Sequence, residues 1–304
     1  MNNLEGLSIV IPVHNEGLGI KSLANSLLSN LAQTIPNLEI ILVDDGSTDE
    51  SWEHLKDLSK TSQNFKCIRL CRNVGQMRAI NHGVLRATQS WVAVIDGDGQ
   101  NPTNALLRMW EIREKDSVIF GVKLVSSQNR FRRLITYMFY KLMSFLLKAK
   151  TLYETGEFKL LSRSVIEKIA KNSNPNSVMR FRVAKLQLKQ VPIFYNLPPR
   201  AFGKSKYSLL KRLHFVLASI FTILERPKLV GVIGLLISLS AELSIISLIV
   251  TKEIWSHFYF VETLLLFIVT LVLILWIYWN YYFAVVFSRD RLLVCEEIGQ
   301  RNDT

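Results

Sequence analysis

From Leu7 to Gly121, short apolar runs alternate with amphipathic stretches. The apolar runs lack the polar alternation of half-buried strands, and they lie at residues 8–13, 39–43, 65–70 and 91–95. The stretches between and after them have the period of amphipathic helices, and they lie at residues 19–31, 49–62, 75–88 and 104–115. Strands that are apolar throughout and alternate with helices are typical of a parallel sheet covered on both faces. With right-handed crossovers, the pattern predicts an α/β fold with a Rossmann-like, mostly parallel sheet.

Two longer apolar stretches lie near the C-terminus, at residues 229–250 and 258–287. Both are close to or above the roughly 20 residues that a helix needs to span a bilayer. The segment between them, residues 251–257, is too short for a domain. The pattern therefore predicts a C-terminal transmembrane α-helical hairpin.

Basic residues flank the hairpin on its outer sides, at Arg226, Lys228, Arg289 and Arg291. The connecting segment carries only Lys252 against Glu253. By the positive-inside rule we expect the N-terminal domain and both termini in the cytoplasm. The predicted domains are thus residues 1–226, which would carry the chemistry, and an anchor with a short cytoplasmic tail at residues 227–304.

The chain carries 37 Lys and Arg against 25 Asp and Glu, a net charge of +12, which favours an anionic partner. No helix-turn-helix, zinc-finger or RNA-binding signature accompanies this charge, so we expect no nucleic-acid partner. Many of the cations lie instead at about residues 130–150 and 204–226, in amphipathic stretches. Such stretches can lie in a membrane interface beside anionic lipids, although residues 130–150 could equally pack on the sheet.

The three cysteines are Cys67, Cys71 and Cys295. An odd number without repeated spacing argues against a disulfide framework, so the sequence predicts free thiols in a reducing compartment. No cleavable signal is evident at the N-terminus, which lacks a charged segment followed by an apolar one.

Acidic residues follow two of the predicted strands: Asp44 and Asp45 after residues 39–43, and Asp96 and Asp98 after residues 91–95. The carboxyl ends of parallel strands share one edge, where open α/β sheets bind ligands. A single acid there is commonly a turn former or helix cap. Because Asp96 and Asp98 stand together, they predict an oxygen-ligand site for Mg²⁺ or Mn²⁺ held against substrate phosphates.

Four segments in order resemble family 2 glycosyltransferases of the GT-A fold: SIVIPVHNE at 8–16, VDDGSTD at 43–49, RNVGQ at 72–76 and DGDGQNP at 96–102. Two later segments, ETGEFKLLSR at 154–163 and PRAFGKSKY at 199–207, are similar to those of the dolichyl- and undecaprenyl-phosphate sugar transferases. The order of a catalytic domain followed by a transmembrane pair is also similar. The dinucleotide fingerprint G-x-G-x-x-G does not follow the first strand.

The resemblance implies a donor site in the loops after the strands. The nucleobase and ribose of the donor would be held by Pro12, Asn15, Glu16 and Asp45. Asp96 and Asp98 match the acidic motif of the family, which binds the metal and through it the donor diphosphate. Gln100 would lie beside that metal and also contact the donor.

The resemblance also implies an acceptor site. The cations that match the segment for the acceptor phosphate are Arg200, Lys204 and Lys206, although a basic patch attracted to any anionic lipid would look the same. Glu157 stands where relatives often carry Asp, so it would orient the acceptor or act as a base. Asp98 and Glu157 are the candidate catalytic residues.

The implied reaction is the inverting transfer of a sugar from a UDP- or GDP-sugar to undecaprenyl or dolichyl phosphate, with Mg²⁺ or Mn²⁺. It would take place at the cytoplasmic membrane face, with membrane lipids as partners and with self-association through the helices as an option. Two alternatives stay open. The enzyme could glycosylate another membrane acceptor, or the chain could be a non-catalytic scaffold that binds nucleotide or lipid.

Overall fold

The computed structural model describes residues 5–124, 137–141, 143–145, 155–172, 183–196 and 294–299, and the separate positions 268, 269, 272, 275, 276 and 279. The chain divides into two compact units, Met1–Ile223 with Leu293–Thr304, and Leu224–Leu292. Apart from those separate positions, both predicted membrane spans lie outside the described residues. No helix within the described ranges is long and apolar enough to cross a bilayer. The hairpin therefore stays a prediction.

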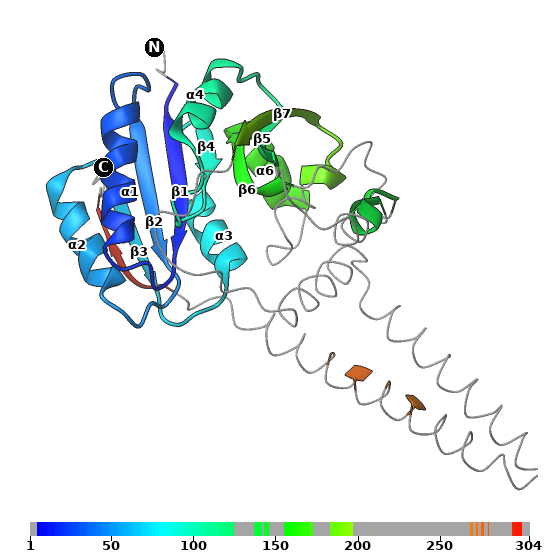
Figure 1. The fold of residues 1–304 in the computed structure, drawn as a ribbon, viewed down its shortest axis with the longest axis horizontal. Helices are drawn as coiled ribbons and strands as arrows, with labels where there is room; N and C mark the ends of the chain where they lie inside the picture. The colour runs from blue at the N-terminus through cyan, green and yellow to red at the C-terminus, as the bar shows by residue number, and fades with distance from the viewer. Residues whose placement is uncertain are drawn as a thin grey trace, which may run out of the picture. The chain divides into compact units, whose positions relative to one another are not determined.

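One mixed sheet forms the first unit, with the described strands in the order β7-β5-β6-β4-β1-β2-β3-β8 (Figure 1). Their bounds are β1 Leu7–Val13, β2 Leu38–Asp44, β3 Phe65–Leu70, β4 Trp91–Val94, β5 Ser117–Leu124, β6 Thr155–Ser162, β7 Lys189–Asn196 and β8 Val294–Ile298. Strand β1 pairs in parallel with β2 and β4, β2 with β3, and β5 with β7. Strand β6 runs antiparallel between β4 and β5, and β8 runs antiparallel to β3. The predicted α/β class with a mostly parallel sheet is confirmed.

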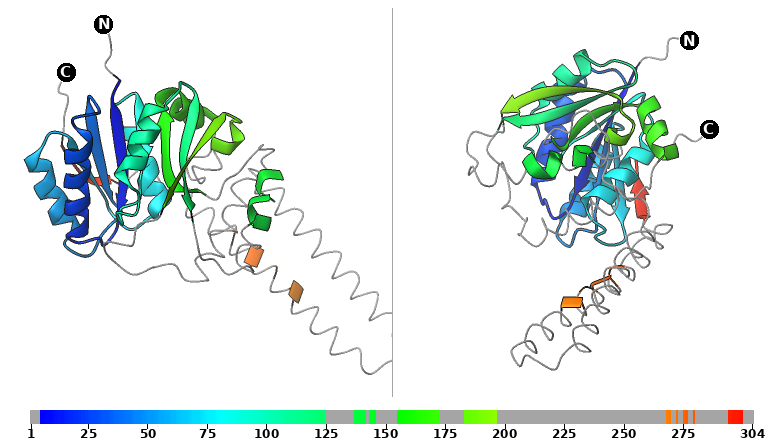
Figure 2. Two further views of the ribbon diagram at one scale, coloured as in Figure 1. Left: turned by 45° about the horizontal axis from the view of Figure 1, so that its top comes forward. Right: turned by 90° about the vertical axis from the view of Figure 1, so that its right-hand side faces the viewer.

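Helices cover both faces of this sheet (Figures 1 and 2). Their bounds are α1 Gly19–Leu31, α2 Ser51–Thr61, α3 Gln76–Arg86, α4 Thr103–Glu111 and α6 Arg163–Asn172. Along β1, Ile9 joins the core under α1, α2 and α4, whereas its neighbour Val10 joins the core under α3 and α6. Burial on both faces is the reason that the central strands are apolar throughout.

Close packing of α3 on the sheet requires a glycine. A Cβ on Gly83 would lie 2.4 Å from Cγ1 of Val10 and 3.0 Å from Cγ2 of Val43. The helix can therefore approach β1 and β2 only because residue 83 has no side chain.

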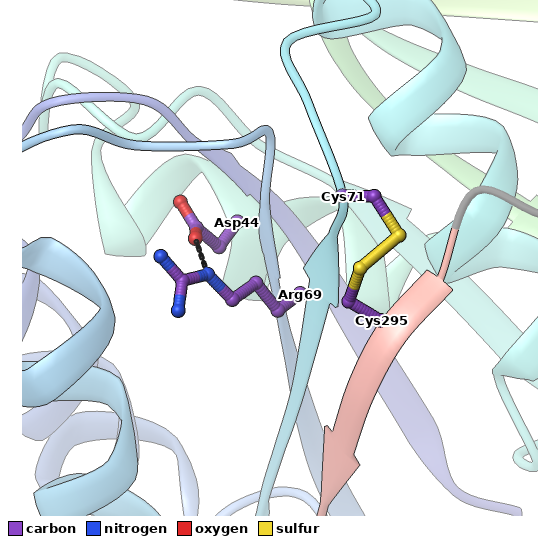
Figure 3. Close-up of a disulfide and its surroundings, with 4 residues drawn as sticks. All are labelled: Asp44, Arg69, Cys71 and Cys295. Carbon is purple, nitrogen blue, oxygen red and sulfur yellow. Dashed lines mark ion pairs between the residues drawn. A yellow bond between two sulfur atoms is a disulfide. The ribbon is translucent and has the colours of Figure 1, made fainter.

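The edge strand β8 is one of the strands that the sequence pattern does not predict. It pairs with β3 across a bulge, because Arg69 pairs with Glu296 while Leu70 pairs with Val294, which leaves Cys295 as the extra residue. Cys295 forms a disulfide with Cys71, with their Cα atoms 5.1 Å apart (Figure 3). The expectation of free thiols is wrong for these two residues and holds for buried Cys67. Strand pairing between residues that are 224 positions apart brings the two cysteines together, and spacing along the chain cannot show it.

Side chains from both faces of the sheet hold β8 in place. Trp52 of α2 donates its indole N–H to Glu296 at 3.2 Å. Glu297 accepts a hydrogen bond from Arg86 of α3 at 2.9 Å, and its other oxygen lies 3.2 Å from Nζ of Lys66. Burial acts to raise the pKa of Glu297, but the hydrogen bonds from Arg86 and Lys66 outweigh it, and the pKa is lowered.

Replacement of Glu297 by Gln should lower the melting temperature by about 2 °C at pH 7, the effect of one partly exposed ion pair. Because the folded pKa is lowered, the carboxylate stabilises the fold above its unfolded pKa of roughly 4.3, and this contribution is lost as the pH falls through the folded pKa. Thermal unfolding of both proteins from pH 7 down to pH 3 would measure the difference. Glu111→Gln, on the exposed end of α4, is the matched control. A Glu297→Gln effect that stays constant with pH would contradict the ion-pair explanation.

Candidate functional site

The loops after β1, β2, β3 and β4 meet at the carboxyl edge of the sheet. Val13, the last residue of β1, is paired with Asp44, the last residue of β2. The N–H of Asp45 donates to the carbonyl of Val13 at 2.8 Å, and the N–H of Ile95 donates to the carbonyl of Val10 at 3.1 Å. Strands β1 and β2 therefore end level with each other, whereas β4 ends opposite Val10. The predicted acidic residues and the first loop lie at the same edge of the sheet.

Asn15 joins the loops after β1 and β2. Its side-chain oxygen accepts a hydrogen bond from the N–H of Thr48 at 2.8 Å, and its own N–H donates to Oγ of Ser47 at 3.0 Å. Asn15 has φ 54°, a left-handed conformation that Asn tolerates better than most residues. The next residue, Glu16, donates its N–H to Oγ of Ser51 at 3.0 Å. Asn15 thus shapes this loop through its own hydrogen bonds.

Pro12 lies buried near the end of β1. Its carbonyl oxygen lies close to the acidic loop, residues 95–102 between β4 and α4. A Cβ on Gly97 would lie 2.7 Å from the Pro12 oxygen. The residue between Asp96 and Asp98 must therefore be glycine for the acidic loop to pack this closely on β1.

Asp45 is a buried anchor for the loop after β3. Its two carboxylate oxygens accept hydrogen bonds from the backbone N–H groups of Val74, at 2.7 Å, and Gly75, at 2.9 Å. Burial raises the pKa of Asp45, and the two backbone hydrogen bonds only partly offset the rise. Each oxygen can accept a second hydrogen bond, so Asp45 can hold this loop and still bind a ligand.

His14, to which the sequence assigned no role, belongs to the same network. Nδ1 of His14 lies 3.0 Å from the carbonyl oxygen of Asp45, and Nε2 lies 3.0 Å from Nδ2 of Asn73. A Cβ on Gly46, which has φ 62°, would lie 2.4 Å from the carbonyl carbon of Arg72. The loops after β1, β2 and β3 therefore form one hydrogen-bonded and closely packed group.

The acidic loop after β4 is held from several sides. Gln76, at the start of α3, donates its side-chain N–H to Oδ1 of Asp96 at 2.9 Å. The backbone N–H of Asp96 donates to Oδ1 of Asn101 at 2.6 Å, and that of Gln100 donates to Oδ1 of Asp98 at 3.1 Å. Gln100 itself is buried. Both acids are thus oriented by neighbours before any ligand binds.

Charge accumulates at Asp96. Burial is the largest influence on this carboxyl and raises its pKa, and Lys123 acts in the opposite direction. Repulsion from Asp98 and Glu157 adds to the rise, and the net shift is upward. A bound cation would relieve this repulsion.

The described residues include no group of three or more His, Cys, Asp or Glu side chains arranged to hold a metal ion. Mg²⁺ is commonly held by one or two carboxylates while water and substrate phosphates complete its shell. Asp96 and Asp98 satisfy that requirement when a diphosphate is present, so the residues fit a divalent cation that binds together with its substrate.

Glu157 lies on β6, which is paired with β4, and it forms a buried ion pair with Lys159 at 2.6 Å. Glu157 is 5% exposed and Lys159 is 3% exposed. A Cβ on Gly156, the preceding residue, would lie 3.9 Å from Oδ2 of Asp96 and 3.9 Å from Nζ of Lys123. The structure therefore brings the start of β6, with Glu157, next to the acidic loop, and it shows that this carboxylate already has a cationic partner.

Tyr195 of β7 contacts Asn101 of the acidic loop. Its hydroxyl oxygen accepts a hydrogen bond from Nδ2 of Asn101 at 3.3 Å, and Tyr195 is buried. Sequence reasoning missed five residues of this region: His14, Gln76, Lys123, Lys159 and Tyr195. Gln76 ends the RNVGQ segment and Lys159 lies in the ETGEFKLLSR segment, so both could have been found there. Lys123 and Tyr195 come from β5 and β7, whose pairing the sequence does not show.

The three predicted acceptor cations, Arg200, Lys204 and Lys206, lie outside the described residues. Their role stays a prediction.

A family model described as "Glycosyl transferase family 2" matches residues 8–170, which include every strand and loop of this site except β7 and β8. The chain belongs to glycosyl transferase family 2. Among its relatives is the uncharacterized glycosyltransferase YkcC of Bacillus subtilis (strain 168), 33% identical over 76% of this chain and 72% of the relative. An undecaprenyl-phosphate 4-deoxy-4-formamido-L-arabinose transferase of Photorhabdus laumondii is 26% identical over 85% of this chain and 81% of that protein.

The fold resembles solved glycosyltransferase structures. Glucosyl-3-phosphoglycerate synthase of Mycobacterium tuberculosis, in complex with Mn²⁺, UDP and glucosyl-3-phosphoglycerate, matches with a TM-score of 0.52. The match covers 73% of this chain and 80% of that one at 15% identity. At this identity the likeness shows the shared GT-A-like fold, and the family assignment makes the protein a glycosyltransferase.

Replacement of Lys159 by Met should destabilise the protein by about 3 kcal/mol, because it removes a buried cation from a buried carboxylate. That corresponds to a drop in melting temperature of roughly 6–12 °C. The double variant Glu157→Gln with Lys159→Met should recover most of the loss, since it leaves neither charge without the other. Thermal unfolding of the two single variants and the double variant would measure this coupling. Additive losses would show that the ion pair does not stabilise the fold.

Proposed function

We propose that this glycosyltransferase moves a sugar from a nucleotide-sugar to a polyprenyl phosphate at the cytoplasmic face of a membrane, with inversion at the anomeric carbon. The observation that carries the proposal is the meeting of Asp96 and Asp98 with Glu157, across the pairing of β4 with β6. Two strand-end carboxylates suit a cation that holds a donor diphosphate. Glu157, with its cationic partner Lys159, would stand beside the acceptor on the neighbouring strand.

The donor half of the proposal rests on the loops after β1, β2 and β3. Asp45 stands at the centre of these loops, where its buried carboxylate accepts two backbone hydrogen bonds. Its remaining lone pairs can accept hydrogen bonds from a nucleobase or ribose. Pro12, Asn15 and Glu16 would line the same site.

The acceptor half rests on the chemistry of a lipid monophosphate. The second pKa of a phosphate monoester is about 6, so the acceptor is largely ionised at pH 7 and needs no strong base. One of its oxygens would attack the anomeric carbon as the bond from that carbon to the donor diphosphate breaks. Attack from the side opposite the leaving group inverts the configuration. Glu157, held by Lys159, would orient the acceptor.

A divalent cation fits this scheme. Mg²⁺ or Mn²⁺ bound by Asp96 and Asp98 would neutralise charge on the departing nucleoside diphosphate. Gln76 and Gln100 would keep the acidic loop in the conformation that binds the cation, because the Gln76 side chain donates to Asp96 and the Gln100 backbone N–H donates to Asp98.

Two observations support membrane association: the lipid acceptor named for relatives of this chain, and the exposed apolar side chains at residues 137–145. Undecaprenyl phosphate appears in the names of relatives that match most of this chain. Within the described part of residues 130–150, large apolar side chains are exposed at Tyr137, Met138 and Phe145. Exposed apolar side chains next to Lys141 suit a helix at a membrane interface. Arg200, Lys204 and Lys206 would bind the acceptor phosphate there, and the spans at residues 229–250 and 258–287 would anchor the enzyme.

Strand β8 supports the same membrane topology. It follows the second unit, Leu224–Leu292, yet it pairs with β3 in the sheet of the first unit. A segment that leaves a folded unit and returns to it must cross a membrane an even number of times. A two-helix hairpin with the catalytic unit and both termini in the cytoplasm meets that condition.

The direct test uses detergent-purified protein with Mn²⁺, a panel of UDP- and GDP-sugars, and either undecaprenyl or dolichyl phosphate. Mass spectrometry would detect a glycosylated lipid and identify both substrates. Nucleotide binding without any lipid product across the panel would favour another membrane acceptor or a non-catalytic scaffold.

Asp98→Asn should lower the rate of lipid glycosylation by about a thousandfold, the scale of removing one electrostatic contact to a developing charge. Asp57→Asn, an exposed acid on α2 that pairs with Lys21, should leave the rate unchanged. Product formation at equal protein concentration measures both variants. An Asp98→Asn enzyme with near-normal turnover would exclude the proposed role of the acidic loop.

Asp45→Asn should weaken nucleotide binding about tenfold, because an amide N–H₂ cannot accept the hydrogen bond from Val74 or from Gly75, and a bond to a charged group is worth about 1.5–3 kcal/mol. Calorimetric titration with UDP and with GDP in the presence of Mn²⁺ would measure the change. The rate at saturating donor should fall much less than the affinity. An unchanged affinity would place the nucleotide elsewhere.

A further inference from the structure

The Cys71–Cys295 disulfide stands directly before the loop that contacts Asp45. Cys71 follows the last residue of β3, and the next residues, 72–75, form that loop. Cys295 is the bulged residue of β8, on the other side of the pairing (Figure 3). Both cysteines are exposed, so a thiol in solution can reach the disulfide.

Residues 72–75 contact the proposed donor site at three points. Val74 and Gly75 donate their N–H groups to Asp45. Asn73 contacts His14, whose other ring nitrogen contacts the carbonyl of Asp45. The backbone at Arg72 and Asn73 also packs against Gly46. A shift of the backbone at Cys71 would therefore move groups that contact the carboxylate of Asp45.

Arg69 links the same strand end to β2. Its Nε lies 3.5 Å from Oδ2 of Asp44, the residue before Asp45, and Figure 3 shows this ion pair beside the disulfide. The guanidinium also lies 5.5 Å from the centre of the Trp52 ring, and Trp52 in turn binds Glu296 of β8. Strand β8, the end of β3 and the loop at residues 72–75 are thus connected by packed and hydrogen-bonded groups.

We propose that the disulfide between Cys71 and Cys295 is a redox-sensitive clamp, which fixes the end of β3 to β8 and so holds residues 72–75 in the conformation that binds the donor nucleotide. This inference rests on the proposed function. Reduction removes the covalent link but leaves the ladder and the ion pairs of β8. The reduced enzyme stays folded and binds the nucleotide more weakly.

The redox step is a thiol–disulfide exchange with a dithiol, either a small molecule or a protein of the thioredoxin class. A thiolate of the dithiol attacks one sulfur, the bond between Cys71 and Cys295 breaks, and a mixed disulfide forms. The second thiol of the reductant resolves it. Two electrons and two protons pass to the cysteines, and the reductant becomes a disulfide. Exposed disulfides in reducing compartments are commonly redox-sensing ones, which agrees with a catalytic unit in the cytoplasm.

The test compares oxidised and dithiothreitol-reduced full-length protein in detergent, with thiol alkylation and mass spectrometry to establish the state of each cysteine. Calorimetry with UDP and GDP, in the presence of Mn²⁺, measures nucleotide affinity. We expect reduction to raise the dissociation constant about tenfold, and in turnover assays to raise the KM for the donor with little change in kcat. The comparison on the unaltered protein needs no substitution.

Variants sharpen the comparison. Cys71→Ser and Cys295→Ser should each bind the nucleotide as the reduced protein does, and neither should respond to dithiothreitol. Cys67→Ser, which changes the buried free thiol of β3, should respond as the unaltered protein does. A disulfide that serves only for stability would lower the melting temperature on reduction without changing nucleotide affinity, and that outcome overturns the proposal.

The remaining outcomes separate failure of the clamp from failure of the proposed function. Thiols at residues 71 and 295 that persist under oxidising conditions would show that no clamp forms. If the nucleotide binds equally in both states, the clamp fails while the proposed function stands. If neither UDP nor GDP binds in either state, the proposed function itself fails, and the clamp with it.

Discussion

The burial of β1 between β2 and β4 is the constraint on which the site depends. Parallel pairing on both sides brings the carboxyl ends of these strands to one edge of the sheet. Ile9 and Val10 then face opposite cores, so a shift of one residue would exchange two sets of apolar side chains and is strongly disfavoured. The positions of Asp45 and of the acidic loop are thereby set by packing far from any ligand.

The edge of this sheet carries three neighbouring carboxylates, Asp96, Asp98 and Glu157, whose mutual repulsion destabilises the fold. Burial and repulsion from Asp98 and Glu157 raise the pKa of Asp96. Lys123 and Lys159 offset part of this charge, and Gln76 holds the carboxylate of Asp96 in place. A cation bound beside these carboxylates would remove repulsion as well as add contacts. The stability that the site lacks comes from the apolar cores beneath it.

The sequence predicts the central half of this structure well, because local patterns determine it. The apolar runs correspond to β1, β2, β3 and β4 within one residue at each end, and the strand-end rule finds Asp45, Asp96 and Asp98. Glu157 came from the resemblance alone. Its strand contains a buried Glu and Lys, so it does not have the apolar pattern of a buried strand. Strand β7 has Pro192 in its middle, and β8 is a short, polar strand far along the chain. The positions of β6, β7 and β8 in the sheet depend on pairing between residues far apart in the chain, which the hydrophobic pattern of the sequence does not predict.

The edge of the sheet at β3 depends on a segment from the far end of the chain, strand β8. Without β8, the backbone groups of β3 would form an open sheet edge, a common site of unwanted pairing between chains. Strand β8 covers that edge, and its own exposed glutamates, Glu296 and Glu297, are held by Trp52 and Arg86. Because these residues follow the unit Leu224–Leu292, the sheet is completed only after that whole segment has been synthesised. This edge of the sheet, next to the loops after β1, β2 and β3, cannot be completed before β8 has been synthesised. The loop at residues 72–75, which donates two hydrogen bonds to Asp45, thus adjoins a strand end whose covalent partner, Cys295, lies 224 positions further along the chain.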